Sequence, residues 1–347
     1  FANHILFSAN LEERNKAKNF ELVVEALQIT TNQQGPVHIN VPFEEPLYDT
    51  VKELKPFNFS DVILNNWEES QVNYKKPASI WNASAKKLIL VGVDYPDKKL
   101  QEIIAAYSKD PSVIVLTETT SNLSGANYIN SIDKVIFSLD EALFKRLQPE
   151  VLMTLGGMVV SKKIKQLLRN HRPIHHWHID EFKAMGTYHC LSEFIQKNPV
   201  CFLQEFSAEI IQVESLYQHS WLELKNEKSA RDQQYLEETV HSDLKSFEQI
   251  LNSIPNHSQL QLGNSSVIRY SQLFDVNKTL EVFCNRGTSG IDGCTSTAIG
   301  AAFASKKQTV FITGDLSFFY DSNALWNNYI PKNFRIVLIN NSGGGIF

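Results

Sequence analysis

Two short apolar runs near the C-terminal end of the sequence limit the possible folds more than any other feature. Residues 309–313 read TVFIT, and residues 334–339 read FRIVLI. Both runs are rich in β-branched residues and are bounded by turn formers, which predicts buried strands. Between them, residues 321–330 read DSNALWNNYI and predict a helix that begins at Asp321 or Ser322. Strand, helix and strand in this order form a β-α-β unit, which implies a parallel sheet.

Polar residues follow each of these two strands. The first run stops at Gly314 and Asp315, and the second stops at Asn340 and Asn341. Open parallel sheets bind ligands at the carboxyl ends of their strands, so the side chains of Asp315 and Asn341 are expected to lie close together. One carboxylate, one amide oxygen and a backbone carbonyl from the glycines that follow form an oxygen-only ligand set. Such a set suits Mg²⁺ that also takes oxygens from a phosphate.

Length and composition exclude several classes of protein. A chain of 347 residues should hold two or three domains, and 43% hydrophobic with 20% charged residues is ordinary globular material. No run approaches the roughly 20 apolar residues that a membrane span needs. The formal net charge of −5 argues against nucleic acid as a partner. Four cysteines without a C-x-x-C pair predict reduced thiols and a cytoplasmic protein.

Four segments carry a resemblance to one enzyme family. They read GPVHINVPFEEPLY at 35–48, NRGTSGIDGCTSTAIGAA at 285–302, GDLSFFYDSNALW at 314–326 and NNSGGGIF at 340–347. A Gly-Asp pair followed about 25 residues later by Asn-Asn is similar to the motif that binds thiamine diphosphate (ThDP). The four segments together, in this order, resemble the 2-succinyl-5-enolpyruvyl-6-hydroxy-3-cyclohexene-1-carboxylate (SEPHCHC) synthase family of menaquinone biosynthesis. The similarity runs along the whole chain and is most specific in 263–347.

The resemblance implies an α/β fold with the architecture of ThDP enzymes, in which helices flank parallel sheets. The expected parts are the C-terminal tail of a pyrimidine-binding domain at 1–50, a linker at 51–80, a central Rossmann-like domain at 81–210 and a diphosphate-binding domain, truncated at its C-terminus, at 211–347. Alternating strand and helix patterns in the central part independently predict a parallel sheet. They include KVIFS at 134–138, which is expected to be a strand.

Both ends of the sequence look cut. It begins at Phe1 without an initiator methionine and stops at Phe347, directly after the metal-type loop. The glutamate that activates ThDP in this family is therefore expected outside the chain, because Glu44 and Glu45 do not match its context. We expect the 347-residue chain alone to be inactive and to bind ThDP weakly. SEPHCHC formation by the purified chain, or micromolar affinity for ThDP in calorimetry, would contradict these expectations.

Carried over residue by residue, the resemblance assigns a metal and cofactor site. The metal ligands for Mg²⁺ or Mn²⁺ would be Asp315, Asn341 and the carbonyl of Gly343. The residues that bind ThDP would be these three together with Gly314, Leu316, Ser317 and Ile291. Ile291 would also be catalytic, because the matching apolar residue wedges under the cofactor and forces its two rings into a V shape. This shape makes deprotonation of the thiazolium carbon intramolecular.

The resemblance also assigns a pocket for two dicarboxylate substrates, 2-oxoglutarate and isochorismate. Arg269 and Arg286 would be the catalytic anion anchors, since the planar guanidinium suits bidentate binding of a carboxylate. Ser265 precedes Arg269 by four residues, so both can share one face of a helix start and line the pocket. Ile346 and Phe347 would supply its apolar contacts.

The implied reaction is a transferase reaction in a homodimer with active sites between chains. ThDP-dependent decarboxylation of 2-oxoglutarate precedes conjugate addition to isochorismate, which gives SEPHCHC. Another ThDP-dependent 2-oxoacid carboligase or decarboxylase stays open as an alternative, although it should lack the paired arginines. A non-catalytic nucleotide-binding module stays open too, because VLMTLGG at 151–157 precedes a helix and could cradle a phosphate. It lacks the full G-x-G-x-x-G pattern, which favours tight packing of strand and helix there.

Overall fold

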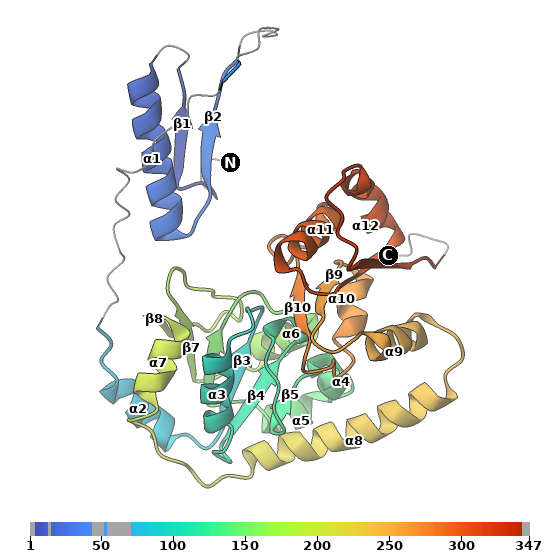
Figure 1. Cartoon of the computed structure of the whole chain (residues 1–347). Helices are drawn as coiled ribbons and strands as arrows, with labels where there is room; N and C mark the ends of the chain where they lie inside the picture. The colour runs from blue at the N-terminus through green and yellow to red at the C-terminus, as the bar shows by residue number, and fades with distance from the viewer. Residues whose placement is uncertain (1–3, 13–14, 44–51, 54–70, 342–347) are drawn as a thin grey trace. The chain divides into compact units, whose positions relative to one another are not determined.

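The computed structural model is an α/β protein. It describes residues 4–12, 15–43, 52–53 and 71–341. The chain divides into two compact units, Phe1–Gln71 and Val72–Phe347. In both units parallel strands are joined by helices, as the sequence predicts (Figure 1).

The first unit contains one β-α-β motif. Strand β1 (Phe7–Asn10) leads into helix α1 (Lys16–Gln33), and strand β2 (Val37–Asn40) returns parallel to β1. The helix begins where it does because the side chain of Asn15 accepts a hydrogen bond from the backbone N–H of Lys18, which satisfies one donor of the first turn.

The second unit begins with a six-stranded parallel sheet in the order β5-β4-β3-β6-β7-β8. Its strands are β3 (Lys87–Val91), β4 (Val113–Thr117), β5 (Tyr128–Ile129), β6 (Val151–Leu155), β7 (His175–Asp180) and β8 (Glu193–Gln196). The chain moves outward from β3 in one direction, then returns to β6 and moves outward in the other. This is the doubly wound arrangement, and its switch point lies between β3 and β6.

Helices cover both faces of this sheet. They are α2 (Lys75–Ala83), α3 (Lys98–Tyr107), α4 (Ile132–Ile136), α5 (Glu141–Arg146), α6 (Lys162–Asn170), α7 (Pro199–Phe206) and α8 (Tyr217–Glu238), with a 3₁₀ turn η2 (Thr119–Ser121). Every residue of β3, β4 and β6 is buried, as expected of parallel strands covered on two sides. One core forms around Trp81 and Trp177, and the other around Trp221 of α8. None of the described helices is both long enough and apolar enough to cross a membrane.

Helix α2 begins at Lys75, inside the range 51–80 in which the sequence suggests a linker. It forms there because Ala78 and Trp81 pack into the core of the sheet, where Trp81 is fully buried. The Trp81 ring stacks on Trp177, with 6.1 Å between the ring centroids.

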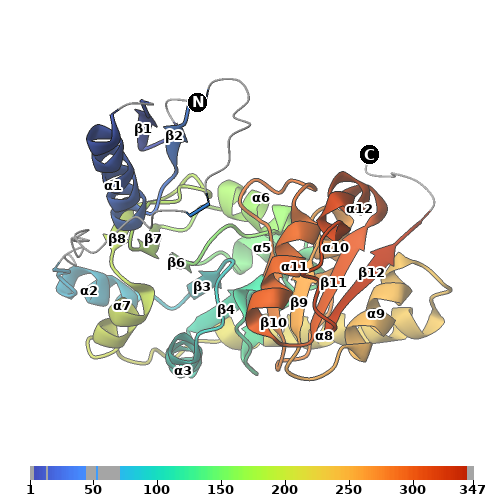
Figure 2. The same cartoon turned by 45° about the horizontal axis from the view of Figure 1, so that its top comes forward.

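A four-stranded parallel sheet follows, in the order β10-β9-β11-β12 (Figure 2). Its strands are β9 (Gln259–Leu262), β10 (Glu281–Cys284), β11 (Thr309–Gly314) and β12 (Phe334–Ile339). Its helices are α9 (Asp243–Ser253), α10 (Ser266–Ser271), α11 (Cys294–Ser305) and α12 (Asp315–Tyr320), with a 3₁₀ turn η3 (Ser322–Leu325). Strand β11 pairs with β12 so that Gly314 lies opposite Ile339, and with β9 so that Ile312 lies opposite Leu262. The carboxyl ends of these three strands therefore lie at one edge.

The expected strand at 134–138 is wrong. Residues 134–136 lie in helix α4, Phe137 is its C-terminal cap and Ser138 follows in a turn. The buried positions are Ile132, Val135 and Ile136, at the spacing of one helical face. β-Branched residues favour a strand, but the spacing of the buried positions is that of one face of a helix.

The helix expected to begin at Asp321 or Ser322 starts there, but it is only a short 3₁₀ helix rather than an α-helix through 330. Helix α12 ends just before this point, and only the short turn η3 follows. The buried carboxylate of Asp321 instead accepts hydrogen bonds from the backbone N–H and the hydroxyl of Ser296, both at 2.6 Å. Asp321 therefore caps α11, a helix that is distant in sequence, rather than one of its own.

The loop after β4 ties the two sheets of the second unit together. The Asn122 side chain donates to Val282 O at 2.9 Å and accepts from Val282 N at 2.8 Å, which holds it on the edge of β10. Glu118, only 2% exposed, accepts hydrogen bonds from Val160 N at 2.6 Å and from Ser161 N at 2.7 Å. Since Val160 packs into the core of the second sheet, Glu118 stabilises the junction.

Glu118 should make the stability of the fold depend on pH. Burial raises the pKa of this carboxyl from its ordinary 4.5 to about 7, although the two backbone N–H groups oppose the shift. Between these values the folded state binds a proton that the unfolded state does not, so stability should fall as pH rises from 4.5 to 7. The contribution is on the order of 3 kcal/mol. The free energy of unfolding, measured with urea at pH values across this range, should fall more steeply with pH for the native chain than for Glu118→Gln.

The matched control is Glu102→Gln, which removes an exposed carboxylate from α3. It should keep the slope of the native chain. Parallel stability curves for the native chain and Glu118→Gln would show that the carboxyl of Glu118 titrates normally.

Candidate functional site

A cavity of about 200 Å³ lies where β9, β11 and β12 end. Its walls come from the starts of α9, α10 and α12, from the loop before α11 and from the end of β12. The lining residues are Asp243, Asn264, Ser265, Ser266, Arg269, Tyr270, Ile291, Gly314, Asp315, Leu316, Ser317, Ile339 and Asn341.

Most of the site residues expected from the sequence meet in this cavity. They are Ser265, Arg269, Ile291, Gly314, Asp315, Leu316, Ser317 and Asn341. Arg286 does not line it, although its guanidinium contacts Asn264, which does. Gly343, Ile346 and Phe347 lie outside the described residues. The cavity is also lined by Asp243 and Asn264, which the sequence analysis did not single out as site residues.

Asp315 and Asn341 each bring a side-chain oxygen to the lining of the cavity. Asp315 is the first residue of α12, and its Oδ1 accepts a hydrogen bond from Leu316 N at 2.7 Å. The Asn341 Nδ2 donates to Asp243 Oδ2 at 3.3 Å, which leaves its amide oxygen directed elsewhere. Asp243 therefore orients the amide of Asn341. In the sequence, Asp243 follows Ser242 at the start of a helix, which indicates only a helix cap and no contact with Asn341.

The oxygen atoms of Asp315 and Asn341 suit a cation that takes its remaining ligands from a phosphate. Within the described ranges no three Asp, Glu, His or Cys side chains are grouped to hold a metal ion. One carboxylate and one amide oxygen, from Asp315 and Asn341, are what Mg²⁺ uses when its other oxygens come from water and a bound phosphate.

Asn264 organises the loop that follows β10. Its side chain is 2% exposed, and its Oδ1 accepts from Arg286 Nη1 at 2.8 Å and from Cys284 Sγ at 3.5 Å. Its Nδ2 donates to the carbonyls of Asn285 at 2.7 Å and Gly290 at 2.6 Å. One buried amide therefore holds both ends of this loop and the guanidinium of Arg286.

Arg286 retains an unsatisfied donor. Its Nε is buried and has no hydrogen-bond partner among the described residues. A buried N–H of a cationic group without an acceptor costs free energy.

The backbone at Ser265 is strained. It adopts φ 68° and ψ −127°, in a region that residues other than glycine rarely enter. The preceding Gly263 allows the chain to pass close to β11, since a Cβ there would lie 3.2 Å from Thr313 Oγ1. Strain of this kind persists where the surrounding structure enforces it and is frequent at ligand sites. Here it presents Ser265 and, one helical turn later, Arg269 to the same cavity.

Ile291 is fixed by a contact between two segments. The hydroxyl of Ser317 donates to Ile291 O at 2.7 Å, and Ser317 is only 4% exposed. The start of α12 therefore holds the backbone that presents the Ile291 side chain to the cavity.

Replacing Asn264 should loosen the loop without unfolding the sheet. In Asn264→Ala the carbonyls of Asn285 and Gly290 and the Arg286 guanidinium lose buried partners, each loss costing about 1–3 kcal/mol. Amide hydrogen exchange across residues 285–291 should therefore accelerate at least tenfold, while exchange in β11 stays unchanged. Asn256→Ala, at an exposed asparagine, is the control and should leave the loop unaffected. Unchanged exchange in Asn264→Ala would remove Asn264 from this role.

The chain is similar along its whole length to several named enzymes, although no protein-family model matches it. It is 50% identical over 347 residues to the SEPHCHC synthase of Flavobacterium psychrophilum, 49% over 352 to that of Flavobacterium johnsoniae and 47% over 374 to that of Christiangramia forsetii. Each match covers 100% of this chain and 63%, 63% and 64% of the relative. The chain therefore belongs to the SEPHCHC synthase family, as a sequence that spans somewhat less than two thirds of these relatives' length.

Proposed function

We propose that this chain works within a ThDP-dependent synthase that decarboxylates 2-oxoglutarate and adds the resulting succinyl unit to isochorismate, forming SEPHCHC for menaquinone biosynthesis. The observation that carries the proposal is the cavity at the edge of the second sheet. It gathers oxygen ligands, an apolar side chain and an arginine from segments far apart in the sequence. The family membership gives this set of residues its chemical meaning.

The metal and the cofactor diphosphate would sit against Asp315 and Asn341. Asp315 contributes the carboxylate, and Asn341 the amide oxygen that Asp243 orients. Gly343, outside the described residues, would add its carbonyl. Together these oxygens would hold Mg²⁺ or Mn²⁺, which would supply positive charge for the cofactor diphosphate. When bound, ThDP supplies an electron sink for the decarboxylation.

Ile291 would support the cofactor in its reactive shape. Its backbone is tied to Ser317, so its side chain projects from a fixed position into the cavity. A rigid apolar support costs no reorganisation when the cofactor binds, which favours an intramolecular proton transfer.

Arg269 and Arg286 would bind the carboxylates of the substrates. Arg269 lines the cavity, and Arg286 is held by Asn264 with its Nε unsatisfied. Two guanidinium groups around one reaction centre favour dicarboxylates, because each can pair with one carboxylate. This pairing favours 2-oxoglutarate over a monocarboxylic 2-oxoacid such as pyruvate.

The structure gives little support to a nucleotide-binding module. In the first sheet, the N–H of Gly157 donates to Val93 O at 2.7 Å. The N–H groups of Val160 and Ser161, at the start of α6, both donate to the Glu118 carboxylate. Three of the donors that could cradle a phosphate are therefore already engaged by the protein itself.

The proposal includes a cytoplasmic homodimer. All four cysteines are free thiols, which suits a reducing compartment. A homodimer with shared active sites is what the family resemblance implies.

Removing the Asp315 carboxylate should weaken binding of the cofactor. In a protein of the relatives' length that contains this chain, Asp315→Ala should raise the Kd for ThDP at saturating Mg²⁺ about 100-fold, because a charged ligand is lost. Isothermal titration calorimetry measures this Kd. Glu237→Ala, an exposed change on α8, should bind ThDP as the parent does. Equal affinities in Asp315→Ala and the parent would refute the metal site.

The same protein should prefer 2-oxoglutarate to pyruvate in kcat/KM when isochorismate is the acceptor. Arg269→Lys should lower kcat/KM for 2-oxoglutarate by about 30- to 150-fold, since loss of a bidentate pair costs about 2–3 kcal/mol. Arg231→Lys, at an exposed arginine of α8, is the matched control. A preference for pyruvate would instead favour another ThDP-dependent carboligase or decarboxylase.

A further inference from the structure

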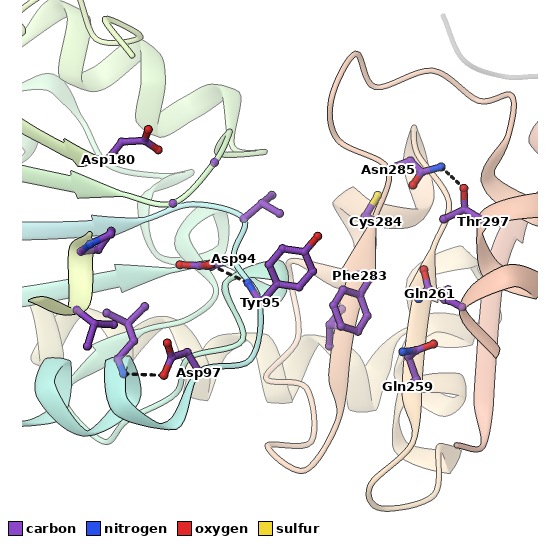
Figure 3. Close-up of a pocket in the computed structure, with 18 of the residues that line it drawn as sticks. Asp94, Tyr95, Asp97, Asp180, Gln259, Gln261, Phe283, Cys284, Asn285 and Thr297 are labelled. Carbon is purple, nitrogen blue, oxygen red and sulfur yellow. Dashed lines mark hydrogen bonds between the residues drawn. The ribbon is translucent and has the colours of Figure 1, made fainter. Parts of the chain in front are cut away.

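A second, larger cavity of about 930 Å³ lies in the same unit, between the two sheets. One wall is formed by the loops that follow β3, β6 and β7, and the other by β9, β10 and α11 (Figure 3). It shares no lining residue with the cavity described above. The first wall contains the switch point of the doubly wound sheet, where folds of this kind bind ligands.

The lining of this larger cavity is acidic. Asp94, Asp97, Asp180 and Glu181 line it, and no described lining residue is basic. No salt bridge involves any of these four carboxylates within the described part of the chain. Burial raises the pKa of Asp94, a hydrogen bond from Tyr95 N lowers it, and the charges of Asp97 and Asp180 raise it again. Backbone N–H groups bind Asp94, Asp97 and Asp180, but no basic side chain in the lining neutralises the negative charge of the cavity.

Two aromatic rings stand beside these carboxylates. Figure 3 shows Tyr95 extending from the first wall toward Phe283 on the second, and their ring centroids are 6.2 Å apart. Tyr95 is 77% exposed and directly follows Asp94 in the same loop. An aromatic face next to carboxylates attracts organic cations through the quadrupole of the ring.

The opposite wall offers hydrogen-bond acceptors. Gln261 lines this wall and is only 6% exposed, and its side-chain amide has no hydrogen-bond partner among the described residues. The Asn285 Nδ2 donates to Thr297 Oγ1 at 2.9 Å, so the acceptor side of this amide remains (Figure 3). Buried acceptors without donors require N–H groups from a ligand.

These features select the ligand class. A phosphate would be repelled by the carboxylates. A metal ion lacks a site, since no three acidic, histidine or cysteine side chains in the described segments are grouped to hold one. Carboxylates, aromatic faces and unpaired amide oxygens all favour a positively charged group that donates several hydrogen bonds.

We propose that the cavity between the two sheets binds an organic cation, with ammonium or guanidinium groups on an apolar chain. The charged end pairs with Asp94 and Asp180, and the apolar chain packs on Tyr95 and Phe283. N–H groups at the far end donate to the amide oxygen of Gln261. A volume of about 930 Å³ is ample for a polyamine.

Calorimetry on the 347-residue chain tests this with spermidine and agmatine as probes. At 0.15 M salt, where surface charge is screened, we expect saturable binding of at least one. Asp180→Asn keeps an acceptor for the two backbone N–H groups that Asp180 Oδ1 binds, yet should weaken binding about tenfold. Gln261→Leu should also weaken it. Glu102→Gln, which removes an exposed charge of α3, should not.

Further binding measurements distinguish an organic-cation site from the alternative ligands. Asp315→Ala should bind the probes as the parent does, so failure of the ThDP assignment leaves this test intact. 1,8-Octanediol, an uncharged chain, should not bind. Absence of saturable binding, or equal losses in Asp180→Asn and Glu102→Gln, would overturn the proposal. Saturable binding of ADP that Asp180→Asn strengthens would overturn it too, in favour of a nucleotide.

Discussion

The parallel pairing of β9, β11 and β12 is the constraint on which the candidate site depends. Because the register places Gly314 opposite Ile339 and Ile312 opposite Leu262, the three strands end at one edge. Side chains that directly follow them have to meet there, however far apart they lie in the sequence. Asp315 and Asn341 share a cavity for this reason.

Buried polar groups at the edges of the two sheets differ in how fully they satisfy their hydrogen-bonding partners. At the edge of the first sheet, Glu118 satisfies the N–H groups at the start of α6, so that position is closed to an external anion. At the edge of the second sheet, Asn264 satisfies two carbonyls and one arm of Arg286, but the Arg286 Nε stays unpaired. Hydrogen bonding therefore satisfies the N–H groups at the first edge and leaves one donor unsatisfied at the second.

The sequence predicts the local parts of this arrangement and misses the distant ones. TVFIT and FRIVLI lie within β11 and β12, because continuous β-branched runs have few alternatives in a covered parallel sheet. The partner of Asp321 is Ser296, which no local pattern indicates, so the sequence alone predicts only a cap for the helix that follows Asp321. Asp243 was missed for the same reason, since its contact with Asn341 spans 98 residues.

The two cavities have opposite chemistry and a physical connection. The smaller one contains Arg269 and lies beside the unpaired donor of Arg286, whereas the larger one is lined by carboxylates and free amide oxygens. Cys284 lines the larger cavity, and its Sγ contacts the Asn264 oxygen that also holds Arg286. A ligand that moves β10 at Cys284 therefore acts on the group that positions Arg286. If occupancy of one cavity changes affinity in the other, linkage requires the effect to be equal in both directions.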